Sequence, residues 1–200
     1  RLVTPSPSRA LPPKILSIIR EEVKAGKSFA HDQNETAWLQ AFLKANYTMP
    51  MLTISSVTGP AEEWFIVGYD SFAAMEKENE KMTKNAAWRN INQTYGSKEG
   101  DLISESRTLT ARYRPEYSYK ANVKIGEYKY FAINIIRFRL GEDVDAYYKA
   151  INGAREKSDL DTHVAVYAVN SGGPVSTYIS MSPIKSMAEW DAPPNAAYQQ

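Results

Sequence analysis

The order of apolar and polar residues predicts two successive series of secondary-structure elements, and each series begins strand–helix–strand–strand. In the first series we expect strands at 14–24, 51–57, 63–69 and 102–113, and helices at 28–45 and from Phe72 up to Gly96. In the second series we expect strands at 130–140, 163–170 and 175–181, a helix from Val144, and a helix that Pro183 opens and Pro193 interrupts. The first series has the β-α-β-β-α-β order of a ferredoxin-like unit. The second series reaches Gln200 with its last strand absent or truncated.

One face of the first predicted helix carries most of its large apolar residues. They recur at helical spacing and are Phe29, Trp38, Leu39, Phe42 and Leu43. We therefore expect this face to cover a sheet, with Asn34 and Glu35 close to the start of the helix.

Several short sequences in the first series have counterparts in the second. Gly59-Pro60 corresponds to Gly173-Pro174, Trp64 to Tyr178, and Arg20 to Arg137. These correspondences occur in the same order in both series, which indicates an internal duplication.

The predicted fold is α+β: two tandem duplicated ferredoxin-like units whose antiparallel sheets pack face to face. A sheet with helices on one face leaves its other face apolar, and a second sheet can cover that face. We expect a disordered leader at 1–13, one repeat at 14–113, a linker at 114–126 and the second repeat at 127–200. If the two sheets of one chain cover each other, the protein does not need to dimerise in order to bury them. A homo-oligomer remains an alternative.

This pattern of a strand, a Gly-Pro turn, a strand and a Phe/Ile-x-x-Met helix, present twice, resembles the dimeric α+β barrel superfamily. Within that superfamily it is most similar to the NIPSNAP-like proteins. The resemblance covers about residues 14–190 and rests on the order of elements. It implies a ligand pocket and leaves the reaction open, because members include cofactor-free quinone-forming monooxygenases, lactone isomerases and haem enzymes.

Composition excludes several classes of protein. The 24 basic and 23 acidic residues give a formal charge of +1, which provides no basic field for nucleic acid. No run approaches the roughly 18 apolar residues that span a bilayer. The absence of cysteine excludes disulfides and thiolate sites. The Pro- and Ser-rich start without an initiator Met favours an exported or periplasmic protein over a cytoplasmic one.

Two arginines are candidates for binding a substrate carboxylate. Arg137 and Arg139 alternate with apolar residues, so their side chains point to the same side of the predicted strand. A guanidinium binds a carboxylate through two parallel hydrogen bonds. The alternative is that these arginines pair with carboxylates of the protein itself, such as Glu21, Glu105 or Glu142.

The other candidate ligand-binding residues are a histidine and two rings. His163 opens a predicted strand near Asp161, where it is either a haem ligand or a hydrogen-bonded structural residue. Trp38 and Tyr167 are either core residues or part of the lining of an aromatic ligand pocket. No HExxH, phosphate loop, nucleophile elbow or dinucleotide fingerprint occurs, so we expect no metal and no cofactor, and no catalytic residue is assigned.

The resemblance thus leads to two expectations of function. The first is a NIPSNAP-like protein that binds a small apolar or aromatic ligand, or a protein partner. The second is a cofactor-independent monooxygenase or isomerase that acts on an aromatic or lactone substrate. Haem binding through His163 is a third alternative.

Overall fold

The computed structural model describes residues 12–47, 50–158 and 161–191, and the chain divides into two compact units. The division falls between Thr110 and Ala111, inside one long strand. Each unit combines an antiparallel arrangement of strands with helices, so the predicted α+β class is confirmed.

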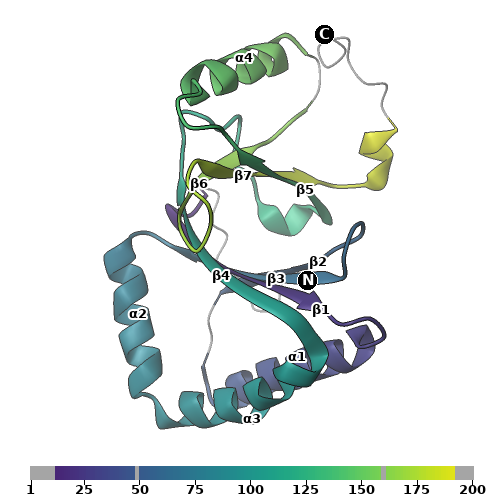
Figure 1. The fold of residues 1–200 in the computed structure, drawn as a ribbon, viewed down its shortest axis with the longest axis vertical. Coiled ribbons are helices and arrows are strands. Elements are labelled where there is room, and N and C mark those ends of the chain that lie inside the picture. Colours follow the sequence, from purple (N-terminus) through teal and green to yellow (C-terminus); the bar gives the residue numbers. More distant parts are fainter. Residues whose placement is uncertain (1–11, 48–49, 159–160, 192–200) are drawn as a thin grey trace. The chain divides into compact units, whose positions relative to one another are not determined.

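The first unit contains most of the secondary structure. Its elements are β1 (Ile15–Val23), α1 (Ser28–Lys44), β2 (Met51–Ser55), β3 (Glu62–Tyr69), α2 (Phe72–Lys84), α3 (Ala86–Leu102) and β4 (Ile103–Tyr113). Its strands are hydrogen-bonded in the order β2-β3-β1-β4, which is the strand order of a ferredoxin-like unit. Helices α1 and α3 lie side by side along one face of this sheet (Figure 1).

Side chains along β1 and β3 point alternately to the two faces of the sheet, and this determines which of them contact the helices. Arg20 lies opposite Trp64, and Glu21 lies opposite Glu63. Because successive residues of a strand point to opposite faces, Arg20 and Trp64 lie on one face of the sheet and the two glutamates on the other. The glutamates lie on the helix face, since both approach His31 of α1.

A single helix was expected from Phe72, but the structure has two. Asn85 leaves the helical conformation, and its side chain accepts a hydrogen bond from the Trp88 N–H, so it caps α3. Ser71 caps α2 in the same way through the Ala74 N–H, as the sequence predicted. Gly96 does not end a helix as expected. It lies within α3, where a Cβ atom would come within 3.4 Å of Cη2 of Trp38, so glycine allows the indole to lie close to α3.

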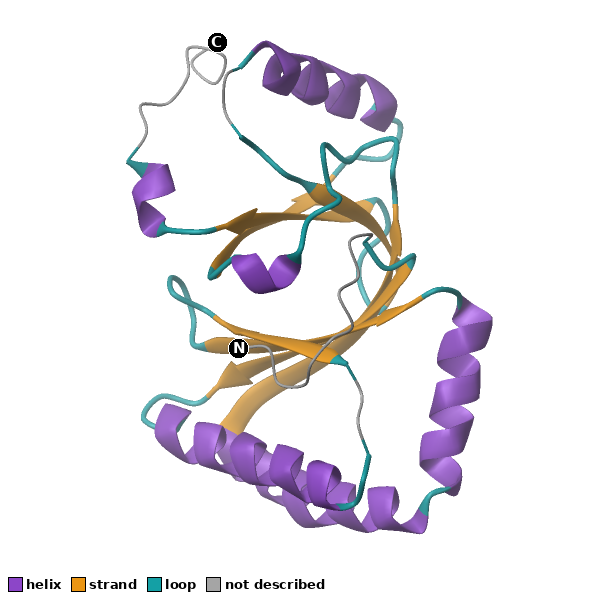
Figure 2. Ribbon diagram, turned by 180° about the vertical axis from the view of Figure 1, so that it is seen from behind, coloured by secondary structure: helices purple, strands orange, loops and turns teal. Residues whose placement is uncertain are grey.

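The second unit continues from the end of β4. Its elements are η1 (Ile125–Glu127), β5 (Tyr130–Arg137), α4 (Val144–Lys157), β6 (Ala165–Ser171), β7 (Thr177–Ile184) and η2 (Met187–Trp190). The strands follow in the order β4-β6-β7-β5, and α4 covers one face of them (Figure 2). Asp143 caps α4 by accepting from the Ala146 N–H.

Pro183 was expected to open a helix, but it lies near the end of β7, opposite Phe131 of β5. The pairing of β6 with β7 ends at Met181, so the missing N–H of Pro183 costs no bond to β6. Up to Asp191, where the described residues end, only the short helix η2 follows. The predicted interruption at Pro193 lies outside the described residues.

The core of the second unit consists of aromatic and β-branched residues. Its buried members are Tyr117, Phe138, Tyr148, Val164 and Val166. Tyr117 falls within the segment expected to be a linker, and its ring stacks on that of Tyr148 with centroids 4.6 Å apart. The segment after β4 therefore contributes to the core of this unit.

Both units place their third strand between the other two: β3 lies between β2 and β1, and β7 lies between β6 and β5. The registers nevertheless do not allow all of the proposed correspondences. Arg20 lies opposite Trp64, whereas Arg137 lies opposite Thr177 and Tyr178 lies opposite Ile136. Arg137 and Tyr178 therefore cannot both be the counterparts of Arg20 and Trp64. That one unit is a copy of the other stays a prediction, as does the packing of two sheets face to face.

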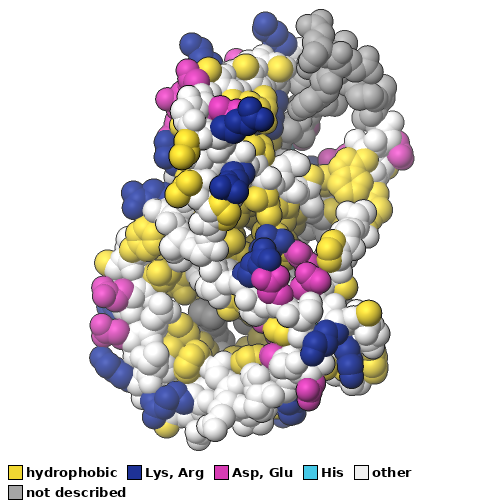
Figure 3. Space-filling view, in the orientation of Figure 1, with side chains coloured by type: hydrophobic (Ala, Val, Ile, Leu, Met, Phe, Trp, Pro, Cys, Tyr) yellow, Lys and Arg dark blue, Asp and Glu magenta, His cyan; other side chains and the backbone are white. Residues whose placement is uncertain are grey.

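Charged side chains of both signs are interspersed over the face shown in Figure 3. Within the described part of the chain, no helix combines the length and apolar character that a membrane crossing requires.

Candidate functional site

A buried histidine surrounded by carboxylates lies between the sheet and the helices of the first unit. His31 of α1 is 0% exposed. Its Nε2 lies 3.1 Å from Oε2 of Glu21 on β1 and 3.5 Å from Oε2 of Glu99 on α3, while its Nδ1 lies 3.7 Å from Oε2 of Glu63 on β3. Glu35 contributes a further carboxylate from α1. We call these five residues the His31 cluster.

The local sequence explains how the cluster forms. His31 and Glu35 are four residues apart on α1 and therefore lie on the same face of the helix. Glu21 and Glu63 are direct cross-strand partners on the face of the sheet that α1 covers. Two carboxylates directly opposite each other repel, and an imidazole held between them provides the compensating positive charge.

Asn34 connects the cluster to α3. It is buried, and its Nδ2 donates to the Tyr95 carbonyl at 3.3 Å and to Oε1 of Glu99. These bonds fix one oxygen of Glu99, while its other oxygen, Oε2, makes no hydrogen bond and faces His31. His31 Nδ1 and Asn34 Oδ1 are also buried without a hydrogen bond. An unsatisfied buried polar atom costs about 1–3 kcal/mol, so three in one place indicate a reason other than packing.

The pKa values of the cluster are strongly shifted. Burial alone would lower the pKa of His31, but the hydrogen bond that it donates to Glu21 and the charges of Glu63 and Glu99 outweigh it and raise the pKa to about 10. Burial, together with the charges of Glu99 and Glu21, raises the pKa of Glu35 to about 8. Burial also raises the pKa of Glu63. The metal-free cluster therefore retains protons at neutral pH.

Trp38, a predicted candidate, lies on α1 two turns beyond His31. Its ring stacks on Tyr95 of α3, with centroids 6.2 Å apart and planes 19° apart. Its Nε1 is buried and makes no hydrogen bond. Phe29, predicted on the same apolar face, is instead exposed, and α1 buries His31 and Asn34. The buried face of α1 is thus more polar than its apolar residues suggest.

The other four predicted candidates lie in the second unit on separate segments. Arg137 is an exposed residue at the end of β5, and Arg139 follows in a turn where its backbone N–H donates to Glu142.

His163 has partners at both ring nitrogens: the Lys120 carbonyl lies 2.7 Å from Nδ1, and Asp161 lies 3.0 Å from Nε2. Tyr167 is buried against Tyr113, with ring centroids 5.4 Å apart. Trp38 therefore lies in a different unit from all four.

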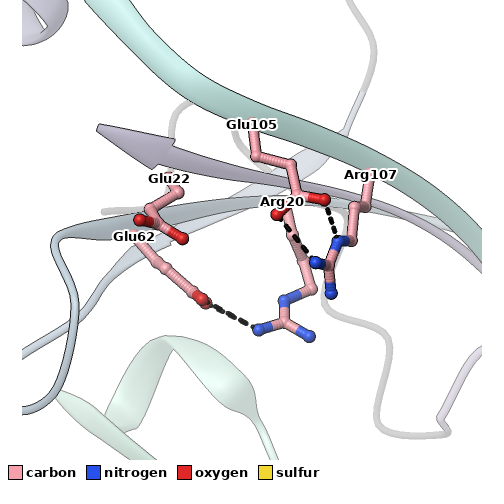
Figure 4. A pocket seen from close by; sticks show the side chains of 5 residues that line it. All are labelled: Arg20, Glu22, Glu62, Glu105 and Arg107. Carbon is pink, nitrogen blue, oxygen red and sulfur yellow. Dashed lines mark hydrogen bonds and ion pairs between the residues drawn. The ribbon is translucent and has the colours of Figure 1, made fainter. Parts of the chain in front are cut away.

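A second polar site lies on the helix-free face of the first unit's sheet (Figure 4). It is a small pocket of about 50 Å³, open to solvent, and is lined by Arg20, Glu22, Glu62, Glu105 and Arg107. Both oxygens of Glu62 accept from Arg20 at 2.9 Å, and the Arg20 guanidinium also covers the Trp64 ring at 4.5 Å. Burial would raise the pKa of Glu62, but hydrogen bonds from Trp64 and Arg20 lower it. Three carboxylates against two guanidiniums do not favour an anionic ligand here.

Sequence reasoning missed the His31 cluster. His31 falls within the helix predicted at 28–45, but no linear motif joins residues that come from β1, α1, β3 and α3. Two signals were present: the i, i+4 pair His31 and Glu35, and a charged end to the apolar strand β1.

Replacing Glu35 with glutamine is expected to stabilise the metal-free protein at about pH 9 by about 1–3 kcal/mol, and to change its stability little at about pH 4. The folded protein holds the Glu35 proton up to about pH 8, while the unfolded chain releases it near 4.5. The folded state thus binds more protons between these values, and stability falls as the pH rises through this range. Glutamine does not ionise, so the variant does not lose this stability as the pH rises. Urea unfolding of both proteins in EDTA at the two pH values would measure it, and a Glu35→Gln protein less stable than wild type at pH 9 would contradict it.

Comparisons with known proteins identify the fold. No family model matches the chain, and no curated protein matches it. Among solved structures, a provisionally assigned monooxygenase from Fusobacterium nucleatum is 12% identical, with a TM-score of 0.55 over 90% of this chain and 79% of its own. An anthrone oxidase-like protein is 10% identical, with a TM-score of 0.55 over 96% of this chain and 81% of its own. A NIPSNAP domain protein from Burkholderia xenovorans is 11% identical, with a TM-score of 0.39 over 48% of this chain and 90% of its own. This chain therefore shares its fold with the monooxygenase-type and anthrone oxidase-like structures, which confirms the predicted dimeric α+β barrel fold.

Proposed function

We propose that this protein is a cofactor-independent oxygenase that binds a hydroxylated aromatic compound beside Trp38 in the first unit. The observation that carries the proposal is the Trp38 indole, which stacks on Tyr95 and has a buried N–H without a hydrogen-bond acceptor. A ring that already has an aromatic neighbour offers a flat apolar surface to a substrate, and the free N–H offers a donor for its oxygen. The structures that match most of the chain, described as monooxygenase and anthrone oxidase-like proteins, support this class of reaction.

The reaction we propose converts an activated aromatic methylene into a carbonyl. The substrate loses a C–H proton to water, and the resulting carbanion transfers electrons to O₂ and forms a carbon–oxygen bond. The resulting peroxide anion takes up a proton from water. The hydroperoxide then loses its second C–H proton and releases hydroxide as the C=O bond forms. Hydroxide takes up a proton, so that methylene and O₂ give carbonyl and water. The protein would contribute by orienting the substrate and stabilising its anionic oxygen through the Trp38 N–H.

Replacing Trp38 with phenylalanine is expected to lower kcat/KM for oxygenation about 10- to 100-fold, because phenylalanine keeps an apolar ring but removes a donor to a charged oxygen. Oxygen uptake with a hydroxylated anthrone would measure the effect. Trp190→Phe is the matched control, since Trp190 lies in the second unit and is 54% exposed. Equal activities of the two variants would show that Trp38 is not at the site.

The same assay distinguishes the oxygenase from a binding protein of NIPSNAP-like type. Quenching of tryptophan fluorescence by the anthrone, without oxygen uptake by the wild-type protein, would support a ligand-binding function and overturn the oxygenase proposal.

A further inference from the structure

We propose that the His31 cluster binds one divalent first-row transition metal ion, with Glu21, His31, Glu35 and Glu99 as its ligands. Each of these residues offers one ligand atom, and the four atoms all lie within 4.8 Å of one another. The sequence had led us to expect no metal, because the ligands come from three separate elements.

The separations in the cluster are close to those of a metal site. Nitrogen and oxygen ligands lie roughly 2.0–2.2 Å from such an ion, which places neighbouring ligand atoms about 3.0–3.5 Å apart in tetrahedral or octahedral geometry. His31 Nε2 is 3.1 Å from Glu21 Oε2 and 3.5 Å from Glu99 Oε2. An ion between these atoms would require only small movements of the side chains.

A buried carboxylate oxygen without a hydrogen bond points into the same place. Glu99 is 8% exposed, and its Oε2 makes no hydrogen bond although it faces His31. Three ligand carboxyl groups and one imidazole lie together in a buried position, where all three carboxyl groups can ionise at low cost only if a cation is present. A divalent ion would neutralise their charge and give Glu99 Oε2 a partner.

Residues outside the ligand set hold the ligands in place. Asn34 donates to Oε1 of Glu99, which leaves Oε2 directed at the site. Glu63 Oε2 lies 3.7 Å from His31 Nδ1, and Ser55 donates to Oε1 of Glu63 at 3.0 Å. A histidine ligand typically binds metal through one nitrogen while a carboxylate orients the other. Glu63 is the carboxylate nearest to Nδ1, and a small movement would bring it within hydrogen-bond distance.

The ligand types favour certain metals. One imidazole with three carboxylates suits Mn²⁺, Fe²⁺ or Zn²⁺, whereas Ca²⁺ and Mg²⁺ prefer sites made only of oxygen. Because His31 is fully buried, the ion would be structural: it would join α1 and α3 to β1. This role is separate from oxygenation at Trp38.

Metal titration of the full chain tests the proposal without any substrate. After treatment with EDTA and its removal, Zn²⁺ or Mn²⁺ at a large excess over its Kd is expected to raise Tm by about 5–10 °C, and elemental analysis of the desalted protein to find one ion per chain. Tm values that neither metal raises would overturn the proposal.

Glu99→Gln separates this site from surface binding. Glutamine has the same size, and its carbonyl oxygen can accept from Asn34, but it removes the charge. It is expected to abolish most of the metal-dependent rise in Tm and to reduce bound metal at least about tenfold. Glu105→Gln, at a partly exposed glutamate that pairs with Arg107 in the solvent-open pocket, is the matched control and should respond like wild type. If Glu99→Gln also responds like wild type, the ion binds elsewhere and the proposal is wrong.

Discussion

Replacing His31 with alanine is expected to lower the free energy of unfolding of the metal-free protein by about 3–5 kcal/mol at pH 7. With its pKa raised to about 10, His31 is protonated at this pH and is the positive charge that faces Glu21, Glu63 and Glu99. Alanine removes that charge and leaves a cavity where a fully buried ring had been. Urea unfolding in EDTA, followed by tryptophan fluorescence, would measure the loss.

The second histidine provides the control. His163 pairs with Asp161, whose side chain is largely exposed, and exposed ion pairs contribute about 0–1 kcal/mol. His163→Ala is therefore expected to cost far less than His31→Ala. Similar losses in the two variants would contradict the view that His31 neutralises buried carboxylates.

The difference in stability between wild type and His31→Ala should also depend on pH, because only wild type has the imidazole that titrates. The raised pKa of His31 means that its contribution to stability is complete below about pH 6.5 and disappears as the pH rises through about 10. The difference in unfolding free energy between the two proteins should narrow over that range. A constant difference would show that the loss comes from the cavity alone.

Replacing Tyr148 with alanine is expected to lower the free energy of unfolding by about 3–5 kcal/mol, as is typical for a buried aromatic residue. Tyr148 is 2% exposed and lies at the centre of the aromatic core of the second unit. Its ring contacts those of Tyr117, Phe138, Tyr147 and Tyr178. Circular dichroism during urea unfolding would measure the loss.

Tyr147 is the matched control, because it is the adjacent residue of the same helix and its ring is partly exposed. Tyr147→Ala removes a ring of the same size that buries less surface, so we expect a loss of about 1–2 kcal/mol. A larger loss at Tyr147 than at Tyr148 would place the centre of this core elsewhere.

The sequence predicted strands better than it predicted helix ends. Each predicted strand corresponds to a strand in the structure, because alternation along a half-buried strand is a strong local signal. The break between α2 and α3 was missed because polar residues continue on both sides of Asn85, and nothing local distinguishes a capping asparagine from an exposed one. The prediction that Pro183 opens a helix was wrong, because a proline is tolerated in β7 only where the pairing with β6 has ended, and the sequence does not show where that is.

The candidate site could be predicted only in part. Trp38 was named because a large ring at helical spacing stands out, and it does lie next to unsatisfied buried polar atoms on α1. The His31 cluster depends on the pairing of β1 with β3 and on the packing of α3 against α1, neither of which is encoded in a local motif. The same dependence on register explains why the sequence matched Arg20 to Arg137 and Trp64 to Tyr178, although the strand pairing does not allow both matches.

The close approach of α3 to Trp38 at Gly96 has a practical consequence for engineering. A methyl group at this position would only just touch the indole, since a Cβ would lie 3.4 Å from its outer edge, whereas any longer side chain would displace it. Substitutions at residue 96 therefore offer graded control over the position of the tryptophan, from a residue that carries neither charge nor hydrogen-bonding side chain. Alanine at residue 96 should also stabilise α3, because alanine loses less backbone conformational entropy than glycine on folding.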